Sequence, residues 1–160
     1  WDVDPIGVYG KMKAEVETHF IGNYNVKILR SSYNFFRQDR FTSYLEKCAL
    51  NGEVAEVFSP FERAVIHRED TVDAILSLSR DWKGPQIINC GGPETVCRSE
   101  FASILKEEVF PNLEYKVVRP PEKFYKDRPS VVSMVSFPIK NILGRSQRSL
   151  RDAIRMEFGV

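Results

Sequence analysis

Residues 7–17 read GVYGKMKAEVE and lie close to the start of the printed chain. Tyr9 and Lys13 are four residues apart, so they lie one turn from each other on the same face if this stretch is helical. An ammonium close to a phenol favours the phenolate, and such a Tyr can pass a proton to or from a carbonyl or an alcohol. The spacing therefore indicates a candidate catalytic pair, although two residues at this spacing also occur by chance on exposed helix faces.

The residues around this pair predict a helix followed by a strand. Apolar residues recur at three- and four-residue spacing over 8–21, and Gly22-Asn23 then provides residues that accept a left-handed backbone. Residues 26–30 are rich in branched apolar side chains and predict a short strand. A strand directly after a helix is typical of one unit of an α/β fold.

The rest of the chain continues the alternation of helices and strands. Periodicity predicts helices over 41–51, 70–80, 99–109 and 149–158, with a short helical stretch at 139–143. Short apolar runs predict strands over 54–58, 64–67, 86–89 and 115–118. We expect loops over 31–39 and an irregular segment after Pro120. Cys97 stands where a Ser or Thr cap is expected, and a thiol is a poor cap.

Composition excludes several classes of function. The chain has 160 residues, the length of one domain, with 23 basic and 22 acidic residues. This near-neutral charge gives no sign of a basic surface that would bind nucleic acid. No apolar run is long enough for a membrane span. Three cysteines, Cys48, Cys90 and Cys97, argue against a disulfide framework and favour a reducing, cytoplasmic location. The two histidines, His19 and His67, lack a second ligand at metal-binding spacing, so we expect no metal site.

Aromatic and arginine residues gather in one segment of the chain. They are Tyr33, Phe35, Phe36, Arg37, Arg40 and Phe41. Such a cluster can stack on single-stranded nucleic acid. Because the net charge is close to zero, we favour a loop that packs on its own fold. His67, on a short apolar strand, is expected to be a core residue rather than a base.

Several segments together resemble one enzyme family. The Tyr-x-x-x-Lys helix and the following strand, which ends in Arg30-Ser31-Ser32, resemble the extended short-chain dehydrogenase/reductases, the sugar-nucleotide epimerases, dehydratases and reductases. Residues 67–74 resemble the family's strand-to-helix segment, and residues 88–92 resemble the strand and glycine turn of its small substrate domain. Residues 127–130, with Lys140 and Leu143-Gly144 after them, resemble the dTDP-4-dehydrorhamnose reductase branch.

The resemblance implies a fold and a division of the chain. The expected fold class is α/β: the C-terminal part of a Rossmann-type parallel sheet plus a small mixed α/β substrate domain. Residues 1–52 would belong to the dinucleotide-binding domain and carry its catalytic helix and the strand after it. Residues 53–160 would form mainly the substrate-binding part, with 64–80 packing back on the Rossmann part.

The resemblance also implies roles for individual residues. Tyr9 would be the general acid/base, and Lys13 would hold the nicotinamide ribose hydroxyls. Ser31 and Ser32 would lie close to the nicotinamide, so the implied cofactor-binding set is Tyr9, Lys13, Ser31 and Ser32. Tyr33 and Arg128 would contact the substrate, but a packed loop aromatic and a solvated arginine remain open as alternatives.

Important parts of the family pattern are missing from the sequence. Neither G-x-x-G-x-x-G nor G-x-G-x-x-G occurs, and no residue before Tyr9 matches the Ser or Thr that polarises the substrate carbonyl. Residues 35–38 replace a loop that often contains glycine. The simplest interpretation is the C-terminal portion of a longer enzyme that uses NAD or NADP, and this chain alone is then expected to be inactive and to bind no dinucleotide tightly.

The expected partners follow from this interpretation. They are a nucleotide-sugar substrate and either the missing N-terminal half or a second copy, joined as a homodimer through the exposed sheet edge. The alternatives are a non-catalytic regulatory or binding subunit with the same fold, and a structural interaction domain. The sequence does not distinguish the sugar, NAD from NADP, or reduction from epimerisation or dehydration.

Overall fold

Strands and helices alternate along the chain in the computed structural model, which describes residues 4–80 and 84–160. The helices are α1 (Gly7–Phe20), α2 (Arg40–Asn51), α3 (Arg68–Arg80), α4 (Arg98–Glu108), α5 (Glu122–Tyr125), α6 (Phe137–Leu143) and α7 (Leu150–Phe158). The strands are β1 (Ile28–Ser31), β2 (Tyr33–Phe35), β3 (Val54–Phe58), β4 (Glu62–His67), β5 (Ile87–Cys90), β6 (Thr95–Cys97), β7 (Glu114–Val118) and β8 (Val131–Val132).

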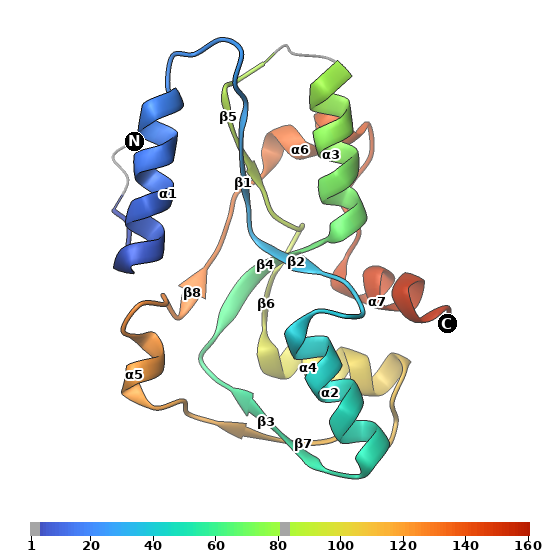
Figure 1. Cartoon of the computed structure of the whole chain (residues 1–160). Helices are drawn as coiled ribbons and strands as arrows, with labels where there is room; N and C mark the ends of the chain where they lie inside the picture. The colour runs from blue at the N-terminus through green and yellow to red at the C-terminus, as the bar shows by residue number, and fades with distance from the viewer. Residues whose placement is uncertain (1–3, 81–83) are drawn as a thin grey trace.

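The strands form three small sheets in which most pairs are parallel. β1 pairs with β5, with Ile28 opposite Ile87. β4 pairs in parallel with β2 and β8 and antiparallel with β6. β3 pairs in parallel with β7. This mixed α/β architecture confirms the fold class that was expected from the sequence (Figure 1).

Two apolar cores hold these sheets and helices together. The larger core lies among α2, α4 and α7 and includes Phe35, Leu45, Phe101 and Ile154. The smaller core joins β4 and β5 to α3 and α6. It consists of Ile66, Ala74, Leu78, Ile88, Cys90 and Ile139.

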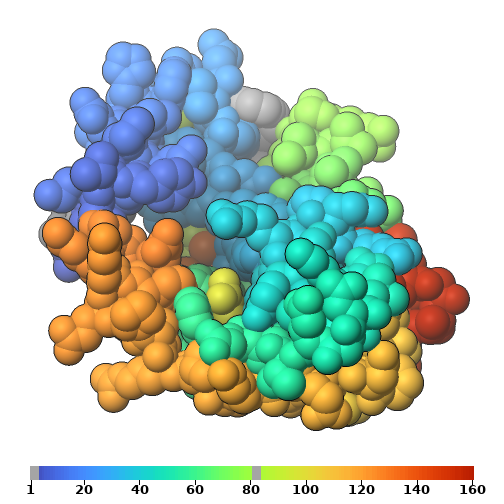
Figure 2. Space-filling view, turned by 60° about the horizontal axis from the view of Figure 1, so that its bottom comes forward, coloured from blue at the N-terminus to red at the C-terminus, as the bar shows by residue number. Residues whose placement is uncertain are grey.

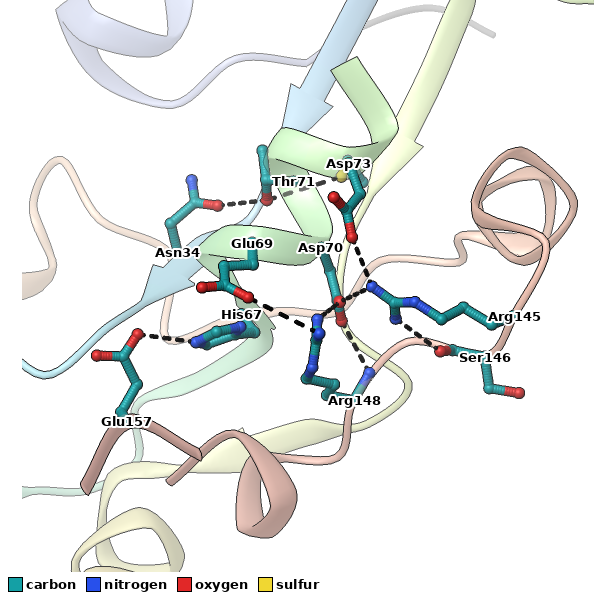
Figure 3. A network of polar contacts seen from close by, with 11 residues as sticks. Asn34, His67, Glu69, Asp70, Thr71, Asp73, Arg145, Ser146, Arg148 and Glu157 are labelled. Atoms are coloured by element: carbon teal, nitrogen blue, oxygen red, sulfur yellow. Dashed lines mark hydrogen bonds and ion pairs between the residues drawn. The ribbon is translucent and has the colours of Figure 1, made fainter. Parts of the chain in front are cut away.

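A buried carboxylate ties the C-terminal segment to the start of α3. Asp70 is fully buried and accepts a hydrogen bond from Arg145 Nη2 at 2.7 Å. It also accepts from the backbone N–H of Arg148 at 2.8 Å and from the Arg148 guanidinium (Figure 3). Asp70, in the segment 67–74 that resembles the family's strand-to-helix segment, is therefore part of the scaffold.

α1 lies at the side of the molecule, beside the β1–β5 pair (Figure 1). None of its 14 residues is buried, and the apolar side chains of Val8, Met12 and Val16 are exposed. Its main polar attachment is the ion pair between Glu17 and Arg30 of β1, with a shortest N–O distance of 2.5 Å. The apolar stripe that predicted this helix therefore faces away from the described core.

The structure corrects several local expectations. Residues 33–35, expected in a loop, form β2, because pairing with Val65–His67 of β4 supplies the hydrogen bonds that a local pattern cannot show. β6 and β8 were not expected either, and both pair with β4. α5 forms within the segment expected to be irregular.

Two further differences concern the second half of the chain. β5 was attributed to the substrate domain by resemblance, yet it pairs with β1 of the catalytic-helix region. Cys97 does act as the N-cap of α4, because its Sγ accepts from the Glu100 N–H at 3.4 Å. A thiol therefore serves here where a hydroxyl was expected.

Candidate functional site

Tyr9 and Lys13 lie together on the exposed surface of α1. The Lys13 Nζ is 5.5 Å from the centre of the Tyr9 ring, and 74 % of Tyr9 is exposed. In the part of the chain that the structure describes, the Tyr9 hydroxyl makes no hydrogen bond, so it is available to a ligand. The four-residue spacing thus brings the two groups together as the sequence predicts.

The first turn of α1 packs against a segment from the second half of the chain. Gly7 has a φ of 70°, and a Cβ placed there would lie 3.0 Å from Asp127 Cβ. The residue after Asp127 is Arg128, one of the residues predicted to contact substrate. Lys13 also lines a cavity of about 220 Å³ together with Glu17 and Arg30. The start of α1 therefore lies against Asp127, the residue that precedes Arg128.

Ser31 is the last residue of β1, and Ser32 follows the strand. The Ser31 Oγ accepts a hydrogen bond from Asn34 Nδ2 at 2.8 Å, whereas the Ser32 backbone N–H donates to Cys90 O at 3.0 Å. The Ser32 Oγ is buried and has no partner among the described residues. A buried hydroxyl without a partner costs about 1–3 kcal/mol, so a ligand atom that bonds it would remove that cost.

Two adjoining cavities lie among the aromatic side chains of α2, β4 and α4. The smaller, of about 190 Å³, is lined by Tyr33, Phe41, Phe61, Arg63, Val65, Val96, Cys97, Arg98 and Phe101. The larger, of about 510 Å³, is lined by Tyr33, Arg40, Phe41, Tyr44, Phe61, Arg98, Phe124 and Arg128. We call the two together the aromatic–arginine groove; Figure 2 shows a hollow between the α5 region (orange) and α2 (cyan to teal).

Tyr33 forms a wall of this groove. Its hydroxyl donates to Asp39 Oδ1, and Asp39 also caps α2 by accepting from the backbone N–H groups of Phe41 and Thr42. Burial, followed by the charge of Asp39, raises the pKa of Tyr33 far above its ordinary value. Tyr33 therefore stays protonated, and its ring can support a ligand without exchanging a proton.

Arg128 and Arg63 approach the groove from different elements. Arg128 is exposed, donates a long bond of 3.4 Å to Phe124 O and lies 5.1 Å from the centre of that ring. Arg63 donates to the backbone carbonyls of Pro129 and Ser130 at 2.9 and 3.3 Å. Burial, followed by the charge of Arg98, lowers the pKa of Arg63. Arg63 thus holds the segment that carries Arg128 in place.

The groove contains residues that the sequence analysis did not assign. Arg63 and Arg98 carried no local signal, because they come from a strand and a helix that only the tertiary fold brings together. The sequence does show the aromatic segment at residues 33–41, and in the structure its side chains lie in two different places. Phe35 is fully buried in the core, while Tyr33 and Phe41 line the groove.

His67 is buried as expected, but only one of its two ring nitrogens has a partner among the described residues. Its Nε2 lies 2.9 Å from Glu157 Oε1 (Figure 3). Its Nδ1 is buried and has no partner among residues 4–80 and 84–160. The histidine joins β4 to α7 and does not line the groove.

Among the described residues, Lys13 offers an ammonium beside the Tyr9 ring, and Ser32 offers a buried hydroxyl without a partner. A glycine-rich phosphate turn is absent from the printed sequence. In the described ranges there is neither a group of three metal-binding side chains nor a helix long and apolar enough to cross a membrane.

The chain is similar in fold to proteins of known structure. The UDP-glucuronic acid 4-epimerase from Bacillus cereus, solved with UDP-glucuronic acid and NAD, has a TM-score of 0.76 and 18% identity over 98% of this chain and 52% of that chain. The dTDP-glucose 4,6-dehydratase from Bacillus anthracis, solved with NAD, has a TM-score of 0.71 and 16% identity over 98% of this chain and 52% of that chain.

A third similar structure is the UDP-glucose 4-epimerase from Stenotrophomonas maltophila, solved with NAD and formylated UDP-arabinopyranose. Its TM-score is 0.74 and its identity 16%, over 94% of this chain and 53% of that chain. No protein-family model and no curated protein sequence matches the chain. The chain thus shares the fold of NAD-dependent epimerases and dehydratases and spans about half the length of these structures.

Proposed function

We propose that this chain is the catalytic-helix and substrate-binding portion of an NAD(P)-dependent enzyme that acts on a nucleotide sugar. The observation that carries the proposal is the contact between Tyr9 and Lys13, 5.5 Å from ring centre to Nζ, on the exposed face of α1. The similar structures support it, since those proteins were solved with NAD and with UDP-sugars.

In the proposed site each residue has one task. Tyr9 gives a proton to the sugar oxygen or takes one from it, and Lys13 holds the ribose hydroxyls. Ser31 and Ser32 contact the nicotinamide end, with the Ser32 Oγ as the unpartnered donor. When bound, NAD or NADP would supply hydride transfer; reduction, epimerisation and dehydration all remain compatible with these residues.

The aromatic–arginine groove is the proposed place for the nucleotide part of the substrate. Aromatic faces such as that of Tyr33 can support a base, and the guanidinium of Arg128 can bond a phosphate. The contact of Gly7 with Asp127 supports this arrangement, because it brings the start of α1 next to the segment that carries Arg128.

The finer organisation is also proposed. Residues 1–52 would be part of a dinucleotide-binding domain and 53–160 mainly a substrate-binding part, nearest the dTDP-4-dehydrorhamnose reductase branch and cytoplasmic. The phosphate-binding turn would come from a preceding half. This chain alone would then be inactive and would bind NAD or NADP more weakly than micromolar.

The proposal is tested by Tyr9→Phe in the intact protein, assayed with NAD or NADP and a panel of nucleotide sugars. Loss of a general acid/base is expected to lower turnover by about 10²–10⁴-fold. Tyr24→Phe is a matched control, because Tyr24 is 92 % exposed and lies beyond the end of α1. Turnover of Tyr9→Phe equal to that of the control would rule out the assigned role.

A second candidate is a non-catalytic regulatory or binding subunit with the same fold. The lack of a glycine-rich turn in the sequence favours it. The same assay separates the two. An intact protein that binds nucleotide sugars but turns over none of them with either dinucleotide would support the binding subunit.

A further inference from the structure

The contacts at the two ends of α1 do little to fix its rotation about its own axis. None of its residues is buried, so apolar packing does not fix that rotation. At its C-terminal end, Gln86 Nε2 donates to Phe20 O at 2.8 Å, and the Gly22 N–H donates to Gln86 Oε1 at 3.0 Å. At its start, Gly7 lies against Asp127. These contacts reach the helix backbone, close to the axis, where they resist rotation weakly.

One side chain of α1 makes a stronger contact. Arg30 Nε donates to Glu17 Oε1 and Oε2 at 3.0 Å each, and Arg30 Nη2 donates to Oε2 at 2.5 Å. Within residues 4–80 and 84–160, this is the ion pair between α1 and the rest of the chain. The Glu17 side chain is 17% exposed, so water screens the pair only in part. Because a guanidinium holds a carboxylate in a fixed orientation, the contact resists rotation of the helix.

The other partner of this ion pair is held by a sheet. Arg30 lies in β1 opposite Asn89 of β5. On either side of it, the backbone N–H groups of Ile28 and Ser32 donate to β5 at 2.8 and 3.0 Å. The ion pair therefore joins α1 to a fixed point of the strand, one residue before Ser31.

Glu17 lies on the side of α1 that carries the candidate pair. Tyr9, Lys13 and Glu17 follow one another at four-residue spacing. Lys13, Glu17 and Arg30 line the same cavity of about 220 Å³. Side chains reach about 5–6 Å from a helix axis, so a rotation of about 10° moves a side-chain group by roughly 1 Å. A displacement of roughly 1 Å can lower a catalytic rate about 10²-fold.

Arg30 also occupies a carboxylate that Lys13 could otherwise bond. A Lys and a Glu four residues apart on a helix are neighbours and form ion pairs. Here the Lys13 Nζ lies 5.5 Å from the centre of the Tyr9 ring, and Lys13 makes no ion pair with any residue that the structure describes. The bonds from Arg30 engage both oxygens of Glu17. Without them, Glu17 would be free to bond Lys13 and draw its ammonium away from the Tyr9 ring.

We propose that Arg30 is a positioning residue for the Tyr9–Lys13 pair: by holding Glu17, it fixes the rotation of α1 and keeps the Glu17 carboxylate away from Lys13. This inference rests on the proposed catalytic role of Tyr9 and adds the residue that sets its position. If Arg30 only stabilised the fold, loss of Arg30 and loss of both partners would have the same effect. The proposed role makes them differ, because only the loss of Arg30 alone leaves an unpaired carboxylate beside Lys13.

The first test is NMR spectroscopy of the 160-residue chain. The Tyr9 ring shifts the signals of the Lys13 methylene protons next to Nζ, and Tyr9→Leu gives their unshifted position. We expect Arg30→Gln to move these signals most of the way to that position. Adding Glu17→Gln should return them toward the wild-type position, because the competing carboxylate is gone. Arg37→Gln, which breaks an ion pair with Glu46 elsewhere in the chain, is the matched control and should leave them unchanged.

Two outcomes of the NMR test would overturn the inference. One is Lys13 signals of Arg30→Gln at the wild-type position, and the other is a double variant whose signals equal those of Arg30→Gln. The second test is turnover of the intact protein. Arg30→Gln is expected to lower kcat about 10²-fold with KM for the nucleotide sugar unchanged, because a misplaced Tyr9 affects the chemical step. A wild-type kcat would contradict the role.

If Arg30→Gln does not fold by circular dichroism, Arg30→Lys takes its place. Its ammonium still pairs with the charge of Glu17 but does not hold it in a fixed orientation. The Lys13 signals should then stay at the wild-type position while kcat falls, and a wild-type kcat contradicts the role. The NMR result does not depend on turnover. If Tyr9→Phe keeps full turnover, the proposed function fails, and the Lys13 signals still decide whether Arg30 controls the position of Lys13.

Discussion

At the scale of single residues, Glu157 shows how a buried carboxylate joins distant parts of the chain. Its side chain is 7% exposed and receives the Arg37 backbone N–H at 3.0 Å, His67 Nε2 at 2.9 Å and Arg68 Nε at 3.4 Å. Burial alone would raise the pKa of Glu157. The hydrogen bonds from Arg37 and His67 and the charge of Arg68 outweigh burial, so this pKa lies below its ordinary value of 4.5.

The lowered pKa has a definite consequence for stability. A carboxylate whose pKa is lower in the folded state stabilises the fold fully above its unfolded-state pKa, and that contribution disappears as the pH falls through the folded-state pKa. We predict that Glu157→Gln lowers the free energy of unfolding at pH 7 by about 1.5–3 kcal/mol, the worth of hydrogen bonds to a charged group. The difference from wild type should shrink below pH 4.5.

Urea unfolding of both proteins between pH 7 and pH 3 measures this prediction. The control is Glu122→Gln, at an exposed glutamate in α5. Its free energy of unfolding is expected to equal that of wild type at every pH. A Glu157→Gln difference that stays constant down to pH 3 would mean that the carboxylate charge is not what stabilises the junction of β4 and α7.

At the scale of elements, α1 has an apolar face that its own chain does not cover. Met12 is 60% exposed and Val16 is 55% exposed. Gln and Met have similar helix propensities, so Met12→Gln tests burial alone. In this chain we predict a change in the free energy of unfolding within about 0.5 kcal/mol, as for other surface substitutions.

In an intact protein whose other half covers this face, the same substitution should lower the free energy of unfolding by about 1.5–3 kcal/mol, because a buried Met side chain is lost from the core. Denaturant unfolding of both proteins gives the two values. Lys11→Gln, at an exposed polar position of α1, should be neutral in both. Equal effects of Met12→Gln in the two proteins would show that α1 stays uncovered.

The elements that the sequence predicts well are those that local chemistry determines. The α2 helix is capped by Asp39 and ends at Gly52, whose φ is 67°. The apolar periodicity between these two residues is enough to predict the helix. β2 is different: a strand of three residues exists only through pairing with β4, far along the chain. The same contrast holds at the site. Tyr9 and Lys13 meet within one helical turn, whereas the groove needs several elements at once.

At the scale of the whole molecule, the small β1–β5 sheet has an unpaired side. Ile28 and Ser32 both direct their backbone N–H groups at the β5 side, to Gln86 O and Cys90 O. Because successive residues of a strand alternate, the N–H groups of Leu29 and Ser31 point to the other side. Within residues 4–80 and 84–160, no strand pairs there.

An unpaired strand edge is a template for another chain. We therefore predict that the 160-residue chain self-associates through β1, and that sedimentation velocity shows a concentration-dependent shift from monomer to dimer. Ser31→Pro should abolish the shift, because it removes an N–H that faces the open side and leaves the bonds to β5 in place. Ser31→Ala keeps that N–H and is the matched control. A single monomeric species at all concentrations would contradict pairing through this edge, as would a dimer that Ser31→Pro leaves intact, since then the contact lies elsewhere on the chain.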